Sequence, residues 1–423
     1  MSIKQNNKFE WGPMMFDFKH AIIIFFIALI LRGALICGWQ LAGHALHISD
    51  DTKGYVELAQ SVARGQGFML DGVISTRRSP IYPLFLAPYM GSKLFPLNVQ
   101  VAQCIIGSGC GVLLYILAAV LFGETAGRIC SALYCFDYML IRQTLAIMPE
   151  TLFLFFLLCF LILLYLSASR PKMSWVVLAG IAGGVSSLTK EAFFIFIPIS
   201  AIALYGLTLG RRKFFLYSFI FLIIYSLTLL PWIVRNSLIH KKIVFLTTSS
   251  GMTLYLGNNP SVDASLYGGE WRRDIDTIYP ETSLGLTDNR DVIRWDRHLM
   301  NKSLAFIRGN KRVFLKNAVL KLIRLWFPFY SDSPQPIKLL CLFQFVLVGV
   351  FSILGFIESR ARWKELFPLY LIIFYVSMVA SITIPVLRYR LPITLVLMIF
   401  SGVPLSNLIC ANNNKQSQSL GGE

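Results

Sequence analysis

Charged side chains are scarce in this sequence of 423 residues, where Asp, Glu, Lys and Arg together make up 14%. Soluble globular domains carry about 25% charged residues. Hydrophobic residues make up 56% of the chain, and 33 residues are phenylalanine. This composition excludes an ordinary soluble protein and predicts an all-α polytopic membrane protein, because a chain in lipid must satisfy its backbone hydrogen bonds internally.

The sequence also lacks the motifs of several large enzyme classes. The sequence contains no Walker-type glycine loop, HExxH, GxSxG or Rossmann glycine pattern. It therefore lacks the motifs that nucleotide hydrolases, zinc proteases and serine hydrolases require. The five His residues are too scattered to propose a metal site. The eight Cys residues lie in or beside apolar stretches at no metal-ligand spacing, which indicates small core side chains and not disulfides or ligands.

Long apolar runs are what the sequence has instead. A membrane-spanning helix needs about 20 mostly apolar residues. About ten stretches approach this length, namely 21–39, 99–122, 126–146, 151–166, 175–188, 192–207, 214–232, 337–357, 366–385 and 391–410. The first shows no clear cleavage site and is interpreted as a retained anchor. The apolar segment 81–95 is short and interrupted by prolines, so we expect a re-entrant or interfacial segment there.

Basic turns set the expected orientation. The turns at 169–172, 210–213 and 358–364 fall on one side if the N-terminus is cytoplasmic, as the positive-inside rule requires. We therefore predict a protein of the cytoplasmic (inner) membrane with both termini cytoplasmic and its active site outside. The predicted organisation is a transmembrane module at 1–232 with a catalytic first outer loop at about 40–98, an extracytoplasmic loop with amphipathic helices at 233–335, transmembrane helices at 336–410, and a polar cytoplasmic tail at 411–423.

The first outer loop holds the densest set of reactive side chains. From Asp51 to Arg64 apolar residues recur at i, i+3, i+4 and i+7, which predicts a short helix lying on the membrane surface. Asp50 and Asp51 stand at its start, where unpaired N–H groups and the helix dipole favour negative charge, and glycines follow its end. Helix capping alone would explain the two acids; a catalytic role is the alternative.

Several arginines fall on the predicted outer face, although the positive-inside rule places basic residues in cytoplasmic loops. An arginine at mid-membrane costs on the order of 2.5–3.5 kcal/mol, and a phosphate at headgroup depth would offset that cost. Snorkelling of each side chain to water or lipid headgroups is the other interpretation. The residues concerned are Arg77, Arg78, Arg235, Arg388 and Arg390. The pair Lys190-Glu191, between two apolar runs, is either mutually neutralising or part of the site.

Several motifs, in order, resemble the C-type (GT-C) glycosyltransferases related to protein mannosyltransferases and the lipid A aminoarabinose transferase. The resemblance covers most of the chain. No single motif decides it; the ordered set does. Its elements are Asp51-x-x-x-Tyr55, Gly65-x-Gly67-Phe68, Arg78-Ser79-Pro80-Ile81-Tyr82-Pro83, Pro149-Glu150, Lys190, Pro231-Trp232-x-x-Arg235-Asn236, Gly257-Asn258-Asn259-Pro260 and Arg388-Tyr389-Arg390-Leu391-Pro392.

The resemblance implies a bundle of transmembrane helices that moves a sugar, with inversion, from a polyprenyl-phosphate donor to a hydroxyl of a glycan, lipid or protein, and no nucleic acid partner. Asp51 would be the general base with Asp50 as the alternative, and Glu150 would position the acceptor or act as a second acid. The donor phosphate would meet Arg78, Lys190, Arg235 and Arg388. Substrate-positioning residues would be Tyr55, Tyr82, Glu191 and Arg390.

Three points stay open at this stage. Relatives carry an acidic pair that begins at the equivalent of Asp51, whereas here Thr52 follows it and the second acid precedes it. No cofactor is implied, and the acid pair could hold a divalent cation but supplies too few ligands to predict one. A transporter or flippase of a lipid-linked sugar is the main alternative, although no internal repeat favours it, and a catalytically inactive scaffold is the third.

Overall fold

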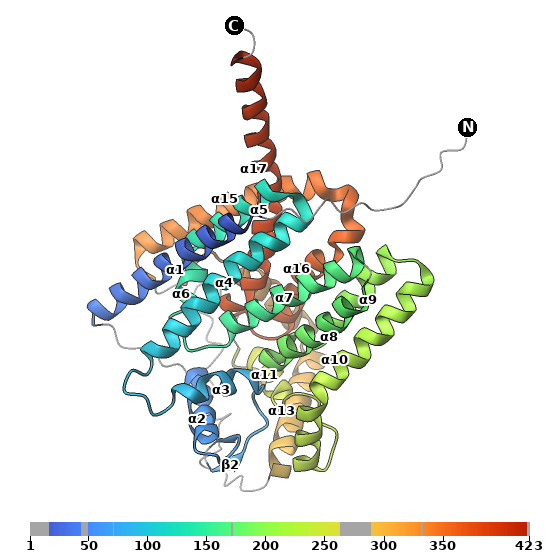
Figure 1. Ribbon diagram of the computed structural model, residues 1–423. Helices are drawn as coiled ribbons and strands as arrows, with labels where there is room; N and C mark the ends of the chain where they lie inside the picture. Colours follow the sequence, from blue (N-terminus) through green and yellow to red (C-terminus); the bar gives the residue numbers. More distant parts are fainter. Residues whose placement is uncertain are drawn as a thin grey trace.

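Long apolar helices form a bundle that occupies most of the computed structural model (Figure 1). The model describes residues 17–43, 50–70, 72–170, 172–262, 289–330 and 333–420. The long helices are α1 (Phe18–Leu41), α4 (Leu97–Phe122), α5 (Glu124–Phe136), α7 (Glu150–Ser169), α8 (Met173–Thr189), α9 (Phe196–Thr208), α10 (Arg211–His240), α15 (Gln335–Ser359), α16 (Trp363–Ile382) and α17 (Leu391–Leu420). The predicted all-α class is confirmed, apart from one two-stranded hairpin described below.

Seven stretches of the described chain are long and apolar enough to cross a membrane. They are Phe18–Leu41, Leu97–Phe122, Glu150–Ser169, Glu191–Thr208, Arg211–His240, Gln335–Ile382 and Leu387–Ala411. The protein is therefore a multi-pass integral membrane protein, with seven such stretches where the sequence predicts about ten.

Three local features account for the difference from the predicted number. The expected run at 126–146 is divided at Asp137, whose carboxylate accepts the Leu140 backbone N–H at 2.9 Å and begins a separate short helix, α6 (Tyr138–Gln143). Helix α8 is apolar but has only 17 residues. The predicted runs at 337–357 and 366–385 are both present as α15 and α16, which count as one stretch only because no more than the 3-10 turn η3 (Arg360–Arg362) separates them.

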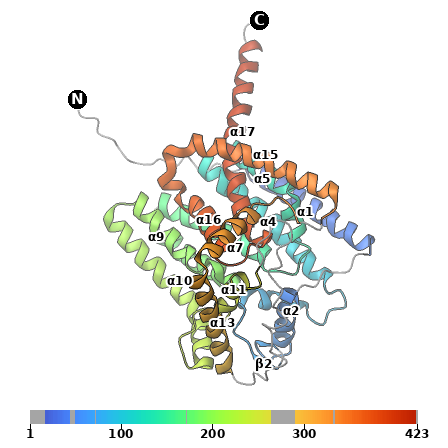
Figure 2. The same ribbon diagram turned by 180° about the vertical axis from the view of Figure 1, so that it is seen from behind.

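Shorter elements form a cap at one end of the bundle. They are α2 (Asp50–Ala63), the antiparallel strands β1 (Met69–Leu70) and β2 (Val73–Ile74), α3 (Ile81–Leu86), η1 (Ala87–Tyr89), α11 (Ser250–Gly257), α13 (Asn289–Gly309) and α14 (Lys311–Leu325). Figures 1 and 2 both show α2, α3, α11 and α13 at the end opposite the projecting part of α17. The segment 81–95 thus forms two short helices and does not span, as predicted.

Helix α2 is the predicted surface helix, and its apolar face anchors the cap. Tyr55, Leu58 and Ala59 are buried, and α2 packs on α3. Tyr55 and Ala59 belong to a hydrophobic cluster that also includes residues of α3, α4 and α7. The helix ends before Gly65 and Gly67, whose φ angles of +73° and +76° are in the left-handed region that glycine adopts without strain. The start of α2 is thereby fixed over the ends of the spanning helices.

Candidate active site

A cavity of about 1700 Å³ lies between the cap and the bundle. Its lining comes from the start of α2, the start of α7, the turn between α8 and α9, helix α11, the segment joining α14 to α15, and the segment joining α16 to α17. Nine basic side chains face five acidic ones across this space. The basic residues are Lys53, Arg77, Arg78, Lys190, Lys242, Arg297, Arg324, Lys338 and Arg388, and the acidic ones are Asp51, Glu57, Glu150, Glu191 and Asp296. The cavity therefore favours an anion.

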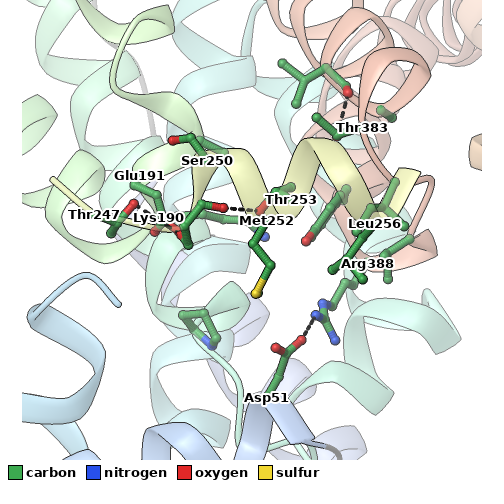
Figure 3. Close-up of a pocket in the computed structure, with 18 of the residues that line it drawn as sticks. Asp51, Lys190, Glu191, Thr247, Ser250, Met252, Thr253, Leu256, Thr383 and Arg388 are labelled. Carbon is green, nitrogen blue, oxygen red and sulfur yellow. Dashed lines mark hydrogen bonds and ion pairs between the residues drawn. The ribbon is translucent and has the colours of Figure 1, made fainter. Parts of the chain in front are cut away.

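Asp51 lies at the centre of an ion-pair network. Its Oδ1 accepts a hydrogen bond from Arg78 Nη2 at 2.7 Å, and its Oδ2 pairs with Arg388 Nη2. Figure 3 shows Arg388 reaching from the opposite side of the cavity to meet Asp51. Arg78 and Asp51 are 27 residues apart in the chain and Arg388 and Asp51 are 337 apart, so the fold brings together three of the sequence motifs that carried the resemblance.

Glu150 extends the network into the bundle. One carboxylate oxygen, Oε1, is 3.0 Å from Lys190 Nζ and 3.1 Å from Arg388 Nε, and the other accepts from Gln143 Nε2 at 3.3 Å. The Glu150 side chain is 3% exposed and opens α7, directly after Pro149. Glu150 therefore holds the two cations in place through Oε1, and among the described residues its other oxygen is bound only by the Gln143 amide.

The network fixes the charge state of Asp51. Burial alone would raise the pKa of this carboxyl, but the guanidinium groups of Arg78 and Arg388 outweigh it and hold the pKa well below its ordinary value. Burial likewise opposes the charge on Arg78, and the neighbouring Tyr55 and Asp51 raise its pKa above the ordinary value. Asp51 is therefore ionised at neutral pH, as the sequence predicts.

Aromatic rings and a third carboxylate, Glu191, complete this wall. The Arg78 guanidinium lies 4.9 Å from the centre of the Tyr55 ring, and Lys190 Nζ lies 4.6 Å from the centre of the Tyr389 ring. Such cation–π contacts stabilise charge where little water is present. Ser79 Oγ donates a hydrogen bond to Glu191 at 2.9 Å.

Three predicted site residues are placed differently, and the side chain of a fourth, Asp50, is not described. The Arg235 guanidinium donates to the Ser75 carbonyl and stacks on Trp232 at 4.4 Å, the Tyr82 hydroxyl donates to Gln103 at 2.8 Å, and Arg390 donates to the Phe327 carbonyl. None of these three side chains lines the cavity. Asp50 begins α2, but its side chain lies outside the described residues. The geometry therefore supports Asp51, Glu150, Arg78, Lys190, Arg388, Tyr55 and Glu191 as cavity residues.

Helix α11 covers one side of the cavity, and the sequence analysis did not predict this role. Figure 3 shows Met252 pointing from α11 toward Asp51. The helix is held by Asp296 of α13, whose Oδ1 accepts the Met252 backbone N–H at 2.9 Å. A Cβ added to Gly251 would lie 1.9 Å from the Asp296 carbonyl oxygen, so only glycine allows α11 and α13 to approach this closely.

A buried lysine fixes the other end of α11. Lys321 of α14 is fully buried, and its Nζ donates to the Gly257 carbonyl at 2.7 Å and to Asn258 Oδ1 at 3.2 Å. Asn258 Nδ2 in turn donates to the Ile382 carbonyl at the end of α16. The Gly-Asn-Asn-Pro motif therefore joins α11 to the segment that carries Arg388.

No group of three metal-ligating side chains forms in the described part of the cavity. The group of this kind among the described residues is Asp17, His20 and Glu124, at the start of α1 and α5. Helix α1 has 24 residues and separates this group from the loop that leads to Asp51, by about 36 Å at 1.5 Å per residue. Of the acids of the cavity, Asp51 and Glu150 are paired with Arg and Lys, as described above.

Residues 90–234 match the model of the family described as dolichyl-phosphate-mannose-protein mannosyltransferase. This match confirms the predicted family. The matched family is one of mannosyltransferases, which agrees with the predicted enzyme class, a glycosyltransferase. The matched segment of the family includes Glu150 and Lys190, whereas Asp51, Arg78 and Arg388 lie outside it. No curated protein matches the chain.

The fold resembles that of a solved glycosyltransferase. The crystal structure of the Archaeoglobus fulgidus oligosaccharyltransferase in the apo form matches with a TM-score of 0.58 at 12% sequence identity. The similarity covers 96% of this chain and 52% of that chain, so this chain spans about half the length of the archaeal protein. At this identity the comparison concerns the fold alone, and it supports the predicted GT-C-like architecture.

Proposed function

We propose that the protein transfers a sugar from a polyprenyl-phosphate donor to an acceptor hydroxyl at the extracytoplasmic end of the bundle, with inversion at the anomeric carbon. The observation that carries this proposal is Asp51, held between Arg78 and Arg388 in a large cavity whose charged side chains are mostly basic. A reaction that removes a proton from a hydroxyl and releases a phosphate needs an ionised carboxylate beside guanidinium groups, and this pair supplies both.

The proposed step conserves atoms and charge. The acceptor oxygen attacks the anomeric carbon, and the bond from that carbon to the phosphate oxygen breaks on the opposite face. Asp51 takes the hydroxyl proton. The phosphate leaves with the bonding electron pair, so its charge changes from −1 to −2. No proton is needed by the leaving group, but additional positive charge near it lowers the barrier.

Arg388 links the two halves of this step. In the structure it pairs with Asp51 through Nη2 and with Glu150 through Nε, so its charge is shared between two carboxylates. As negative charge develops on the leaving phosphate, Arg388 gains a third anionic partner and its hold on Asp51 weakens. Asp51 then becomes a stronger base at the point where the proton must move.

The experiment is mass spectrometry of polyprenyl-phosphate sugars and envelope glycoconjugates in cells with and without the protein. We expect deletion to make one lipid-phosphate sugar accumulate while one glycoconjugate loses that sugar, and the wild-type gene to restore both. Purified protein should then transfer the accumulated sugar. Unchanged levels of every lipid-phosphate sugar after deletion would refute the proposed function.

A further inference from the structure

The cations around Asp51 are already neutralised by neighbouring acids. Arg78, Lys190 and Arg388 stand among Asp51, Glu150 and Glu191, which gives three positive and three negative charges. A polyprenyl-phosphate sugar carries one negative charge on its phosphate before the reaction. This network therefore has no surplus positive charge with which to bind the donor in its ground state.

Some other basic side chains of the cavity are not paired with a described carboxylate. Within the described residues, four Lys or Arg side chains line the cavity and form no ion pair with a described carboxylate: Lys53, Lys242, Arg297 and Lys338. The first three are exposed to water, whereas Lys338 is half-buried. An ion pair at an exposed site contributes little because water and salt screen it, so Lys338 offers the strongest interaction of the four.

Lys338 belongs to a face of α15 whose character changes along the helix. Gln335, Lys338, Leu339 and Leu342 follow the i, i+3, i+4, i+7 spacing, and all four line the cavity. Leu339 and Leu342 are also 59% and 42% exposed on a membrane-spanning helix, so the cavity wall continues into the lipid-facing surface at this point. Along α15, the cavity-lining face therefore places the cation Lys338 before the apolar side chains of Leu339 and Leu342.

This side of the cavity also adjoins the reactive network. Lys338 Nζ lies 5.9 Å from the centre of the Phe329 ring. The next residue, Tyr330, lines the cavity, and Arg388 and Glu150 lie near enough to act on its hydroxyl electrostatically. Lys338 is therefore one short segment away from the Asp51 network and is separate from its ion pairs.

We infer that Lys338 binds the donor phosphate in the ground state and that the polyprenyl chain leaves the cavity along Leu339 and Leu342. This assignment rests on the proposed function and extends it, because sequence reasoning assigned the phosphate to the arginines and Lys190 alone. Lys338 binds the phosphate already in the ground state, so most of its contribution appears in donor binding, and the charge that develops on the phosphate adds a smaller part. Arg388 acts on the charge that develops as the bond breaks.

The test compares two probes, polyprenyl phosphate and the uncharged polyprenol of the same chain length, on purified full-length protein in nanodiscs. We expect Lys338→Gln to weaken binding of polyprenyl phosphate by about ten- to a hundredfold, which is typical of one lost charge-assisted contact, and to leave polyprenol binding unchanged. Lys338→Arg should retain the affinity. The matched control is Lys316→Gln, on the exposed surface of α14 outside the cavity, which should have no effect.

In turnover, Lys338→Gln should raise KM for the donor more than it lowers kcat, because Lys338 already holds the phosphate in the ground state and gains only the added attraction of the charge that develops on it. A purely structural role would lower kcat or the melting temperature and would not distinguish the two probes. Equal binding of polyprenyl phosphate by wild type and Lys338→Gln overturns the inference, and so does an equal loss in Lys316→Gln. If wild type does not prefer polyprenyl phosphate to polyprenol, the proposed function itself fails.

Discussion

Replacing Asp51 by Asn separates its two roles, proton acceptor and partner of two arginines. The amide cannot take the acceptor proton, and general-base catalysis contributes roughly 10²–10⁴ in rate. Because Arg78 and Arg388 hold the pKa of Asp51 far below neutral, it is a weak base in the resting site, so we expect kcat to fall by the lower part of that range, about 10²–10³-fold.

The same substitution should tighten donor binding. Two unit charges 4 Å apart attract by about 4 kcal/mol at an effective dielectric of 20, and the side chains here are 19–27% exposed, which reduces this value. Without the carboxylate, part of that attraction becomes available to a phosphate. We expect about tenfold tighter binding of polyprenyl phosphate, or about 1.4 kcal/mol.

The assay is single-turnover transfer together with equilibrium binding. Glu358→Gln, a carboxylate-to-amide change at an exposed residue that accepts a hydrogen bond from Asn407, serves as the matched control and should leave both values unchanged. A rate for Asp51→Asn within threefold of wild type, or weaker binding of polyprenyl phosphate, would refute the reasoning.

Two further predictions concern the segment that fixes α11. Gly257→Ala should lower the free energy of unfolding by about 3 kcal/mol, because its Cβ would lie 2.0 Å from the Thr383 carbonyl oxygen, whereas Gly309→Ala, which meets nothing within 4 Å, should be neutral in the same denaturation assay. Burial lowers the pKa of Lys321 to about 8, so between pH 8 and 10.5 the unfolded chain binds the extra proton and folding becomes more favourable as pH rises. The stability of wild type relative to Lys321→Met should therefore increase over that interval by about 3 kcal/mol at most, and a decrease with pH would contradict the assignment.

The sequence predicted the parts of the site that depend on local pattern. The helical period and the glycines located α2, and the position of Asp51 at its start follows from them. Outer-face arginines identified Arg78 and Arg388, because charge at membrane depth needs an anion. The same rule applies to Lys338, at the start of an apolar run on the side predicted to be outer, and would have identified it. Lys338 was not predicted, because sequence reasoning placed the donor phosphate on the arginines and on Lys190.

Side-chain direction could not be predicted in the same way. Arg388 and Arg390 are two residues apart in one short motif, yet one lines the cavity and the other donates to the Phe327 carbonyl. The segment η4 (Leu387–Arg390) is a 3-10 turn, which points these two side chains in different directions. The position of α11 over the cavity could not be predicted either, because it depends on contacts with α13 and α14, which are distant in sequence.

Arg235 tests how far an outer-face cation indicates substrate binding. Its Nη1 and Nη2 both lie 3.3 Å from the Ser75 carbonyl, and its guanidinium stacks on Trp232 and Phe68, so it joins α10 to the loop after β2. A lysine keeps the charge but loses the planar fork and the stacking. We expect Arg235→Lys to cost about 1–2 kcal/mol of stability by denaturant unfolding, with KM for the donor unchanged, and Arg212→Lys, exposed at the other end of α10, to alter neither. A raised KM at unchanged stability would instead return Arg235 to the donor phosphate, as its sequence motif predicts.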